Sequence, residues 1–252
     1  MASMWTNSSG KALADYPHPT LAVDVALLTV VWEGRRGQLA VLLHQSEDGF
    51  AAGQWCLPGV MVGIQELLAD AARRALRDKG GVNSAHPRQL QVFDALDRDE
   101  RGRVISVAHA DVVPAHRLEL AGPRILAPVI GTRPQLPGRQ RRLPFDHNAI
   151  VDAAIDWARR SYQRKADPYR LLGPEFTLSD LQRVHEAVLG TELVKDTFRR
   201  TFSEYLTPTG AERTGSVGRP AAVYRHMTRD ERHAHRARQD QRRTATRRSR
   251  AD

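Results

Sequence analysis

The segment PGVMVGIQELLADAARRALRDKGGV, residues 58–82, decides the fold of the first half of the chain. Its middle part, QELLADAARRALRDK at 65–79, is rich in alanine and leucine. The apolar residues recur at helical spacing and define one apolar face: Leu68, Ala71, Ala72, Ala75 and Leu76. The segment therefore predicts an amphipathic helix over 65–79.

Four apolar runs surround this helix and are typical of β-strands. The runs LAVDVALLTVVW (21–32) and QLAVLLHQ (38–45) are rich in apolar and β-branched residues, with the turn-forming EGRRG between them. The runs QLQVFDAL (89–96) and RVISVAHADVV (103–113) follow the helix and flank a charged turn at 97–103. This pattern predicts an α/β domain over 18–144, preceded by a flexible lead-in at 1–17.

The pattern changes from Phe145 onward, where strand signals largely vanish. DHNAIVDAAIDWARRSYQRK predicts a connecting helix within 145–167. FTLSDLQRVHEAVLG predicts a second helix, capped by Thr177 or Ser179, and VKDTFRRTFSEYL predicts a third that begins at Asp196. A glycine-rich turn region and the short strand AAVYRH follow. This order is typical of a winged helix-turn-helix, here over 168–226.

Positive charge is concentrated in two short segments. The 252-residue chain has 38 Lys and Arg against 29 Asp and Glu, a formal net charge of +9. Residues 133–142 hold four arginines and no acidic residue, and 227–252 hold nine arginines and four acidic residues. Arginine runs of this kind are usually solvated and bind polyanions with little sequence preference. We expect 227–252 to be a disordered tail, either a solubilising end or a contact for nucleic acid.

Cysteine content and hydropathy limit the class of protein. The single Cys56 excludes a disulfide framework and a cysteine-based zinc cluster, and it is typical of a reducing compartment. The longest apolar run, 21–32, contains Asp24 and is shorter than the ~20 residues that span a bilayer. The N-terminus has no apolar signal-peptide region. We expect a cytoplasmic protein without a membrane partner.

The predicted helix that begins at Asp196 has the charge that a DNA-reading helix needs. A helix in the major groove lies between phosphates, so that cationic side chains on its outer face stabilise the complex. The candidate DNA-binding residues lie on this helix and on the following wing: Lys195, Thr197, Arg199, Arg200, Arg219 and Arg225. A helical hairpin with a solvated basic face would have the same spacing.

Residues 58–82 resemble the Nudix box, G-x5-E-x7-R-E-U-x-E-E-x-G-U, in which U is aliphatic. The matching positions are Glu66, Arg74, Leu76, Gly81 and Val82, and Asp78 replaces a glutamate. The preceding WCLPG (55–59) is similar to the family's W-x-L-P-G. The resemblance implies a helix whose carboxylates hold divalent cations against a diphosphate, where the metal activates water.

The sequence departs from the Nudix box at positions that carry its chemistry. Val60 replaces the first glycine, Ala75 replaces the glutamate after the arginine, and Lys79 replaces the second paired glutamate. Two anions are lost and one cation is gained, so Mg²⁺ held by carboxylates would bind weakly or not at all. We therefore predict no metal site and no catalytic residues. The alternative is a Mg-dependent hydrolase of nucleoside diphosphate derivatives that uses Glu66 and Asp78.

The order of the two units resembles the Nudix-related transcriptional regulators over roughly residues 18–226. The similar segments are RDERGRVISVAHADVVP (98–114), LPFDH (143–147), EFTLSDLQRVHEAVLG (175–190), FRR (198–200) and GRPAAVYR (218–225). The resemblance implies a Nudix-like α/β/α sandwich with a mixed sheet and a winged helix. It also implies a homodimeric bacterial repressor that binds double-stranded operator DNA. Its effector would be ADP-ribose or a related NAD- or pentose-derived nucleotide, and the helix within 145–167 is either a transmitter or a plain linker.

The effector-binding candidates lie on the charged turn, in the Nudix-like segment and in LPFDH: Arg98, Arg101, Arg103, Glu66, Lys79 and His147. The three arginines suit bidentate contacts to a diphosphate, although Asp97, Asp99 and Glu100 lie among them and also suit local ion pairs. Lys79 is hypothesised to take over the charge of the missing cation. An RNA-associated protein that binds through its tail is a further alternative.

Overall fold

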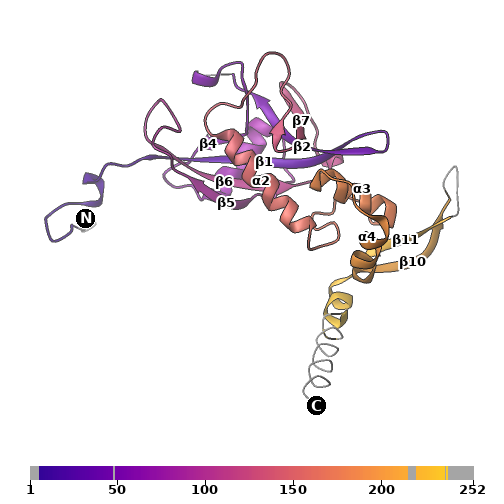
Figure 1. The fold of residues 1–252 in the computed structure, drawn as a ribbon. Helices are drawn as coiled ribbons and strands as arrows, with labels where there is room; N and C mark the ends of the chain where they lie inside the picture. Colours follow the sequence, from indigo (N-terminus) through magenta and orange to yellow (C-terminus); the bar gives the residue numbers. More distant parts are fainter. Residues whose placement is uncertain (1–5, 48, 215–219, 236, 238–252) are drawn as a thin grey trace.

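The computed structural model describes residues 6–47, 49–214, 220–235 and 237. The first of its two units is a sheet with helices on both faces, and the smaller second unit lies beside one end of that sheet (Figure 1).

The sheet of the first unit is mixed. Its strand order is β5-β6-β1-β2-β7-β8, with β3 paired to β2 and β4 paired to β1. β1 and β6 run parallel, whereas β1 and β2 form an antiparallel hairpin. The strands are β1 (Thr20–Glu33), β2 (Arg36–Gln45), β3 (Trp55–Cys56), β4 (Gly59–Met61), β5 (Arg88–Phe93), β6 (Val104–Val112), β7 (Arg124–Ile130) and β8 (Arg133–Pro134).

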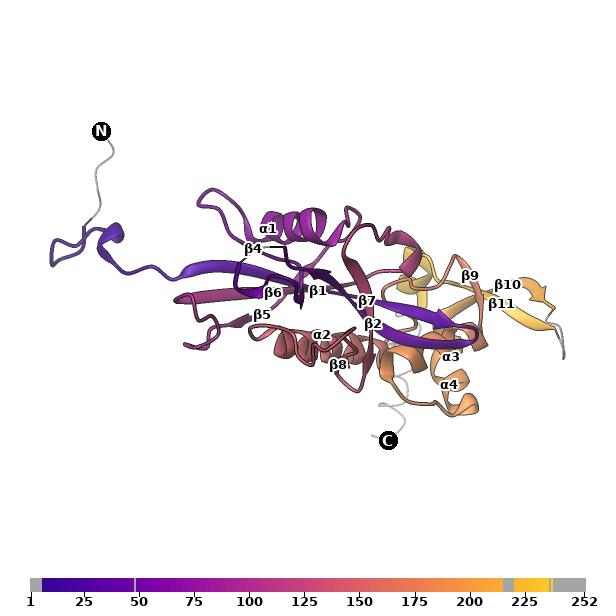
Figure 2. The ribbon, with the colours of Figure 1, turned by 90° about the horizontal axis from the view of Figure 1, so that it is seen from above.

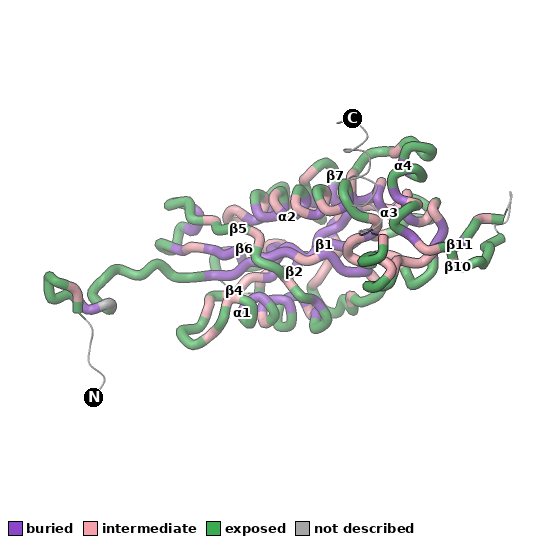
Figure 3. The backbone as a smooth tube through the Cα atoms, turned by 90° about the horizontal axis from the view of Figure 1, so that it is seen from below, coloured by how far each residue is buried: buried purple, intermediate pink, exposed green. Residues whose placement is uncertain are grey.

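Two helices cover opposite faces of this sheet, α1 (Leu68–Ala75) and α2 (His147–Tyr162) (Figure 2). Successive side chains of a strand point to opposite faces, and β1 serves both layers in this way. Its Val23, Val25 and Leu27 pack in the α1 layer, and its Ala26, Leu28 and Val30 pack in the α2 layer. Figure 3 shows that β1 is buried along most of its length. The predicted α/β/α sandwich with a mixed sheet is confirmed.

The helix expected over 65–79 is shorter and changes its geometry. It begins at Leu68 and continues after Ala75 as a π-helical turn over Leu76–Gly80. Gly81 then ends it with a φ of 69°, a left-handed conformation that glycine adopts without steric cost. The wider π turn changes the direction of the residues at its end, including Lys79.

The second unit is a winged helix. Its sheet has the order β10-β11-β9, and buried Phe176, Leu181, Phe198, Phe202 and Leu206 form its core. The elements are β9 (Glu175–Thr177), α3 (Leu178–Leu189), α4 (Lys195–Phe202), β10 (Leu206–Arg213) and β11 (Ala221–His226). Shorter helical turns in the chain are Leu13–Asp15, Gly49–Ala51, Ala115–Arg117 and Ser203–Tyr205.

The N-terminal caps of α3 and α4 differ. Thr177 forms a capping box with Asp180, as the sequence suggested for the start of α3. The prediction that the next helix begins at Asp196 was wrong, because Val194 is its N-cap and Lys195 its first residue. Asp196 therefore lies in the first turn, where its carboxylate is close to the positive end of the helix dipole.

The two units share one apolar core. Val184, Ala187 and Val188 of α3 belong to the same buried cluster as residues of α2 and the sheet. The β1–β2 hairpin also approaches α3 closely at Gly37, where an added Cβ would lie 2.9 Å from the Cβ of Ala187. The two units are thus joined by packed side chains as well as by the connecting chain.

The chain ends hold some local structure in their described parts. Within the predicted lead-in, Asn7 Oδ1 accepts hydrogen bonds from the backbone of Ser9 and Lys11. Residues 229–235, within the tail predicted to be disordered, are helical, and Glu231 there binds Arg225 of β11. In the described part of the chain, no helix is long and apolar enough to cross a membrane.

Candidate functional site

A cavity of about 310 Å³ opens between the sheet and the start of α2. Its lining comes from β1, β2, β4, the end of the π turn, the loop before β6 and the residues that lead into α2. The polar side chains that matter for its chemistry are Asp24, His44, Lys79, Arg98, Arg101 and His147.

Asp24 lies buried at this cavity and collects several donors. The hydroxyl group of Ser106 donates to its Oδ2 at 2.7 Å, Arg98 Nη2 donates at 3.2 Å, and His147 Nε2 lies 3.3 Å from Oδ1. Burial by itself raises the pKa of this carboxyl, but His147, Ser106 and Arg98 lower the pKa to about 2. A Cβ at position 59 would lie 2.0 Å from Asp24 Oδ1, so Gly59 is required here.

Arg98 connects Asp24 to the first turn of α2. Its guanidinium group is almost fully buried and donates to both carboxylate oxygens of Asp146, at 2.8 and 2.7 Å. Asp146 is the N-cap residue of α2, yet its side chain makes no capping hydrogen bond because it binds Arg98. The next residue, His147, accepts a hydrogen bond from the Leu57 amide at Nδ1. The start of α2 is therefore held by the same charges that line the cavity.

Aromatic and cationic side chains form one wall of the cavity. The rings of Phe50 and Phe145 have centroids 6.2 Å apart, and the Arg101 guanidinium lies 5.3 Å from the Phe145 ring centroid. Arg101 also binds Asp99 through two side-chain hydrogen bonds. Phe145 has a φ of 54°, which is uncommon for a residue other than glycine and is associated with functional sites. Such a wall suits a planar aromatic ring.

Lys79 lies at the boundary of this cavity with a second one of about 200 Å³; both are also lined by His44 and Ser46. The Arg124 guanidinium group holds the backbone at this point, donating to the carbonyl oxygens of Lys79 at 2.6 Å and Asp78 at 3.3 Å. Burial and then the charge of Lys79 lower the pKa of His44 to about 4. Neutral His44 thus lies beside a cation.

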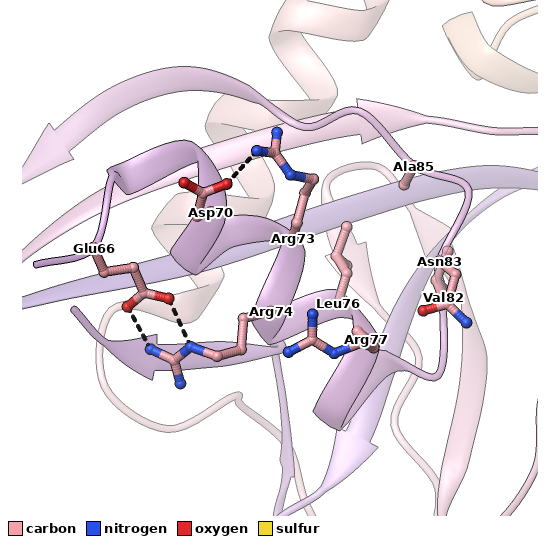
Figure 4. A pocket seen from close by; sticks show the side chains of 9 residues that line it. All are labelled: Glu66, Asp70, Arg73, Arg74, Leu76, Arg77, Val82, Asn83 and Ala85. Atoms are coloured by element: carbon pink, nitrogen blue, oxygen red, sulfur yellow. Dashed lines mark hydrogen bonds and ion pairs between the residues drawn. The ribbon is translucent and has the colours of Figure 1, made fainter. Parts of the chain in front are cut away.

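Glu66 lies elsewhere, at a third cavity of about 270 Å³ along α1 (Figure 4). Its carboxylate accepts two hydrogen bonds from Arg74, at 2.8 and 2.7 Å, and one from the Gly63 amide. The Arg74 hydrogen bonds are the main cause that lowers the pKa of Glu66 to about 2. Figure 4 shows this pair beside Arg73 and Arg77.

The residues present do not fit a divalent cation of the kind that the Nudix box implies. Glu66 is bound to a guanidinium group, Asp78 is paired with Arg77, and Lys79 brings a positive charge to the cavity. Within the described residues, no three or more His, Cys, Asp or Glu side chains are grouped so as to hold a metal ion.

The structure brings together four of the six effector candidates. Lys79, Arg98, Arg101 and His147 line the first cavity, while Glu66 does not. Arg103 does not line it either, because its guanidinium group donates to the carbonyl oxygens of Asp94 and Ala95. Sequence reasoning missed Asp146, His44, Phe50 and Phe145. Asp24 carried a signal, since it is the only charged residue within the apolar run 21–32.

In the second unit, α4 presents one polar face. Lys195, Thr197, Arg199 and Arg200 are exposed, while Phe198 and Phe202 are buried beneath them. A groove of about 550 Å³ beside this helix is lined by Gln182, Lys195 and Arg199, among others. The wing candidates differ from expectation: Arg225 is paired with Glu231, and Arg219 lies outside the described residues. Three of the four exposed residues named on this face of α4 are cationic.

Both units are similar to known proteins. Residues 168–226 match the family model of the NrtR DNA-binding winged helix domain. The ADPR responsive transcriptional repressor NtrR of Acinetobacter baylyi is 30% identical over 223 residues, which are 86% of this chain and 86% of that protein. An ADP-ribose pyrophosphatase of Methanocaldococcus jannaschii is 28% identical over 142 residues, 56% of this chain and 76% of that protein.

A solved structure extends this similarity to the whole fold. The crystal structure of Shewanella oneidensis NrtR complexed with a 27mer DNA has a TM-score of 0.66 and 28% sequence identity. The match covers 82% of this chain and 93% of that chain. The similarity therefore includes both the sandwich and the winged helix.

Proposed function

Because this chain belongs to the NrtR family of transcriptional repressors, we propose that it represses transcription in response to a nucleotide. In this proposal the winged helix binds operator DNA. A nucleotide related to ADP-ribose fills the cavity beside Asp24 and releases the DNA.

The polar face of α4 carries the DNA-binding part of the proposal. Three of its exposed residues, Lys195, Arg199 and Arg200, are cationic, and the helix is fixed from behind by Phe198 and Phe202. A rigid helix with a cationic outer face suits the major groove, where phosphates flank the base edges. The relative from Shewanella oneidensis was solved with DNA, which supports the same role for this unit.

The first cavity supports the effector part of the proposal. It combines an aromatic wall at Phe50 and Phe145 with the cations Lys79 and Arg101. An aromatic wall suits a purine base and a cationic region suits phosphates. The Acinetobacter baylyi relative is named as ADPR responsive, and the Methanocaldococcus jannaschii relative as an ADP-ribose pyrophosphatase. ADP-ribose is therefore the first effector to test.

The helix α2 offers a route from the cavity to the reader. Its N-cap, Asp146, and its first residue, His147, bind the charges at the cavity. Its last residue, Tyr162, donates a hydrogen bond to Asp167 at 2.9 Å. The Asp167 amide in turn donates to His185 of α3. A ligand that prefers one position of α2 would shift the population of reader arrangements by its differential affinity.

The residues of the Nudix-like segment favour sensing of a nucleotide over its hydrolysis. Ala75 and Lys79 stand where the Nudix box has glutamates, and Glu66 is bound to Arg74. The second candidate function is a Mg-dependent nucleotide hydrolase, which the pyrophosphatase relative favours. Release of AMP from ADP-ribose in Mg²⁺, absent in a Glu66→Gln variant, would support the hydrolase and contradict the proposal.

A homodimer completes the proposal, because repressors of this kind use two readers on one duplex. Two winged helices related by a two-fold axis would bind half-sites about one helical turn, or a multiple of it, apart. A footprint with a single half-site would contradict this arrangement.

The DNA-binding part is tested by substitution on α4. Arg199→Ala and Arg200→Ala are each expected to weaken binding to the duplex upstream of the chain's own coding sequence by ~1–3 kcal/mol where they contact base edges. Mobility shift across a salt series measures this, with Arg117→Ala, an exposed arginine of the first unit, as the matched control. Unchanged binding in both α4 variants would contradict the proposal.

A further inference from the structure

Three cationic side chains line the first cavity, and their charges are balanced to different degrees. Arg98 is paired with both Asp24 and Asp146, and Arg101 is paired with Asp99. The Lys79 side chain has no ion pair or hydrogen bond with any residue that the structure describes. An anion that enters this cavity therefore meets one cation whose charge is not already compensated.

The electrostatic influence of Lys79 extends into the cavity. After burial, its charge is the largest cause that lowers the pKa of His44, and it also acts to lower the pKa of buried Cys56. Lys79 contributes to the lining of the two adjoining cavities of about 310 and 200 Å³. A ligand longer than one ring could thus extend past Lys79 from one cavity into the other.

Lys79 is exposed, and the backbone that carries it is held in place. Arg124 of β7 donates hydrogen bonds to the carbonyl oxygens of Asp78, Lys79 and Ala121. Carbonyl groups at a helix end lack partners within the helix, and the guanidinium group satisfies two of them here. An added Cβ at Gly81 would lie 3.3 Å from this guanidinium group, so the turn and Arg124 fit closely.

We propose that the Lys79 ammonium group is the anion-binding centre of this cavity and holds the diphosphate of a nucleotide without a divalent cation. Arg124 acts as a positioning residue for it. This inference rests on the proposed function and deepens it, because it names the charge that recognises the effector. It also explains the departure from the Nudix box: a side-chain cation lies where a carboxylate would have held a metal ion.

The test is isothermal titration of the full chain with ADP-ribose, in EDTA and in MgCl₂. The wild-type protein is expected to bind with the same affinity, within twofold, in both buffers. Lys79→Gln removes a charge-assisted hydrogen bond and is expected to raise the Kd at least about tenfold. Lys79→Arg keeps the charge and is expected to lose less affinity for ADP-ribose than Lys79→Gln. In EDTA, Lys79→Glu is expected to lose more affinity for ADP-ribose than Lys79→Gln, because it places an anion beside the diphosphate.

Arg77→Gln is the matched control, because it removes a positive charge from the same turn but faces the cavity of Figure 4. It is expected to leave the Kd within twofold of wild type. Arg124→Gln is expected to raise the Kd by a smaller factor than Lys79→Gln, because the ammonium group remains but its position is looser. Thermal melting and duplex binding of each variant confirm that the chain is folded.

The outcomes separate this inference from the proposed function. If ADP-ribose binds and Lys79→Gln binds it equally well in EDTA, the inference is overturned and the sensing function stands. Wild-type binding that requires Mg²⁺ overturns the inference in the same way. If the wild-type chain binds no ADP-ribose in either buffer, the proposed effector fails and the inference fails with it.

Discussion

Asp24 and Asp167 are both buried carboxylates, but they lie in regions of different character. Asp24 belongs to the first cavity, and its partners include the charged Arg98, which it shares with Asp146. Asp167 lies between α2 and the winged helix. It accepts hydrogen bonds from the Tyr162 hydroxyl and from the amides of Leu171 and Leu172, while His226 Nε2 lies 3.5 Å away.

We propose that this difference separates a ligand-binding cavity from a joint, by which we mean Asp167 and the side chains and amides that it contacts between α2 and the winged helix. At the cavity, charges from distant parts of the chain are balanced against one another, so an anionic ligand can change which pairs form. At the joint, the donors to the Asp167 carboxylate are mainly neutral: the hydroxyl group of Tyr162 at the end of α2 and two backbone amides of the loop that follows Asp167. These hydrogen bonds fix the geometry of the loop. Asp167 also has a φ of 39°, a conformation that Asp tolerates better than most residues. We infer that the joint transmits movement and that the cavity initiates it.

The largest effect is expected at the joint. Asp167→Ala would leave the buried Tyr162 hydroxyl and two half-buried backbone amides without their acceptor. Breaking such a network is expected to lower the free energy of unfolding by about 3–5 kcal/mol. Urea denaturation measures the loss, with Asp167→Asn as the shape-matched control. A loss below about 1 kcal/mol for the alanine variant would contradict the role of Asp167 as a joint.

Acid is expected to weaken both regions through their histidines. Burial is the main cause that lowers the pKa of His44, beside the cavity, and of His185, at the joint, to about 4 each. The unfolded chain takes up these protons below about pH 6.5. The stability from the neutral histidines is therefore present above pH 6.5 and is lost as the pH falls towards 4.

Between pH 7 and pH 5, each of these histidines is expected to cost about 2 kcal/mol of unfolding free energy. Urea denaturation at the two pH values measures the total loss in unfolding free energy. His44→Gln and His185→Gln are each expected to remove the contribution of one histidine to this pH dependence. Equal stability at pH 7 and pH 5 in the wild-type chain would contradict the burial of neutral histidines in both regions.

A smaller effect is expected at the cavity carboxylate. Asp24→Asn removes the negative charge but keeps the shape, and Arg98 retains its two hydrogen bonds to Asp146. The expected loss in unfolding free energy is about 1.5 kcal/mol, below that of Asp167→Ala. If Asp24→Asn proved the more damaging of the two substitutions, the distinction between an adaptable cavity and a fixed joint would be wrong.

The sequence predicts the fold better than it predicts the contacts. The apolar, β-branched run at 21–32 and the box at 58–82 are local signals, and they correspond to β1 and α1. The strand β7 was missed although RILAPVI lies between Gly122 and Gly131. The helix also ends differently from the prediction: Leu76–Gly80 forms a π turn, and carbonyl groups in it bind Arg124, which is distant in sequence.

The site residues show the same limit. Lys79 was nominated because a motif gives its position a meaning, and it does line the cavity. Glu66 was nominated from the same motif, but Arg74 holds it on another side of α1. The joint had no sequence signal, because Asp167, His185 and His226 are separated along the chain and meet only through the packing of the winged helix on α2.

The most direct test of the account is fluorescence anisotropy of a labelled duplex from the chain's own upstream DNA, bound by the full chain and titrated with ADP-ribose in EDTA. The account predicts that the anisotropy falls to that of free duplex and that ADP-ribose is recovered intact. Anisotropy that stays high at saturating ADP-ribose, or cleavage of the nucleotide during release, would contradict it.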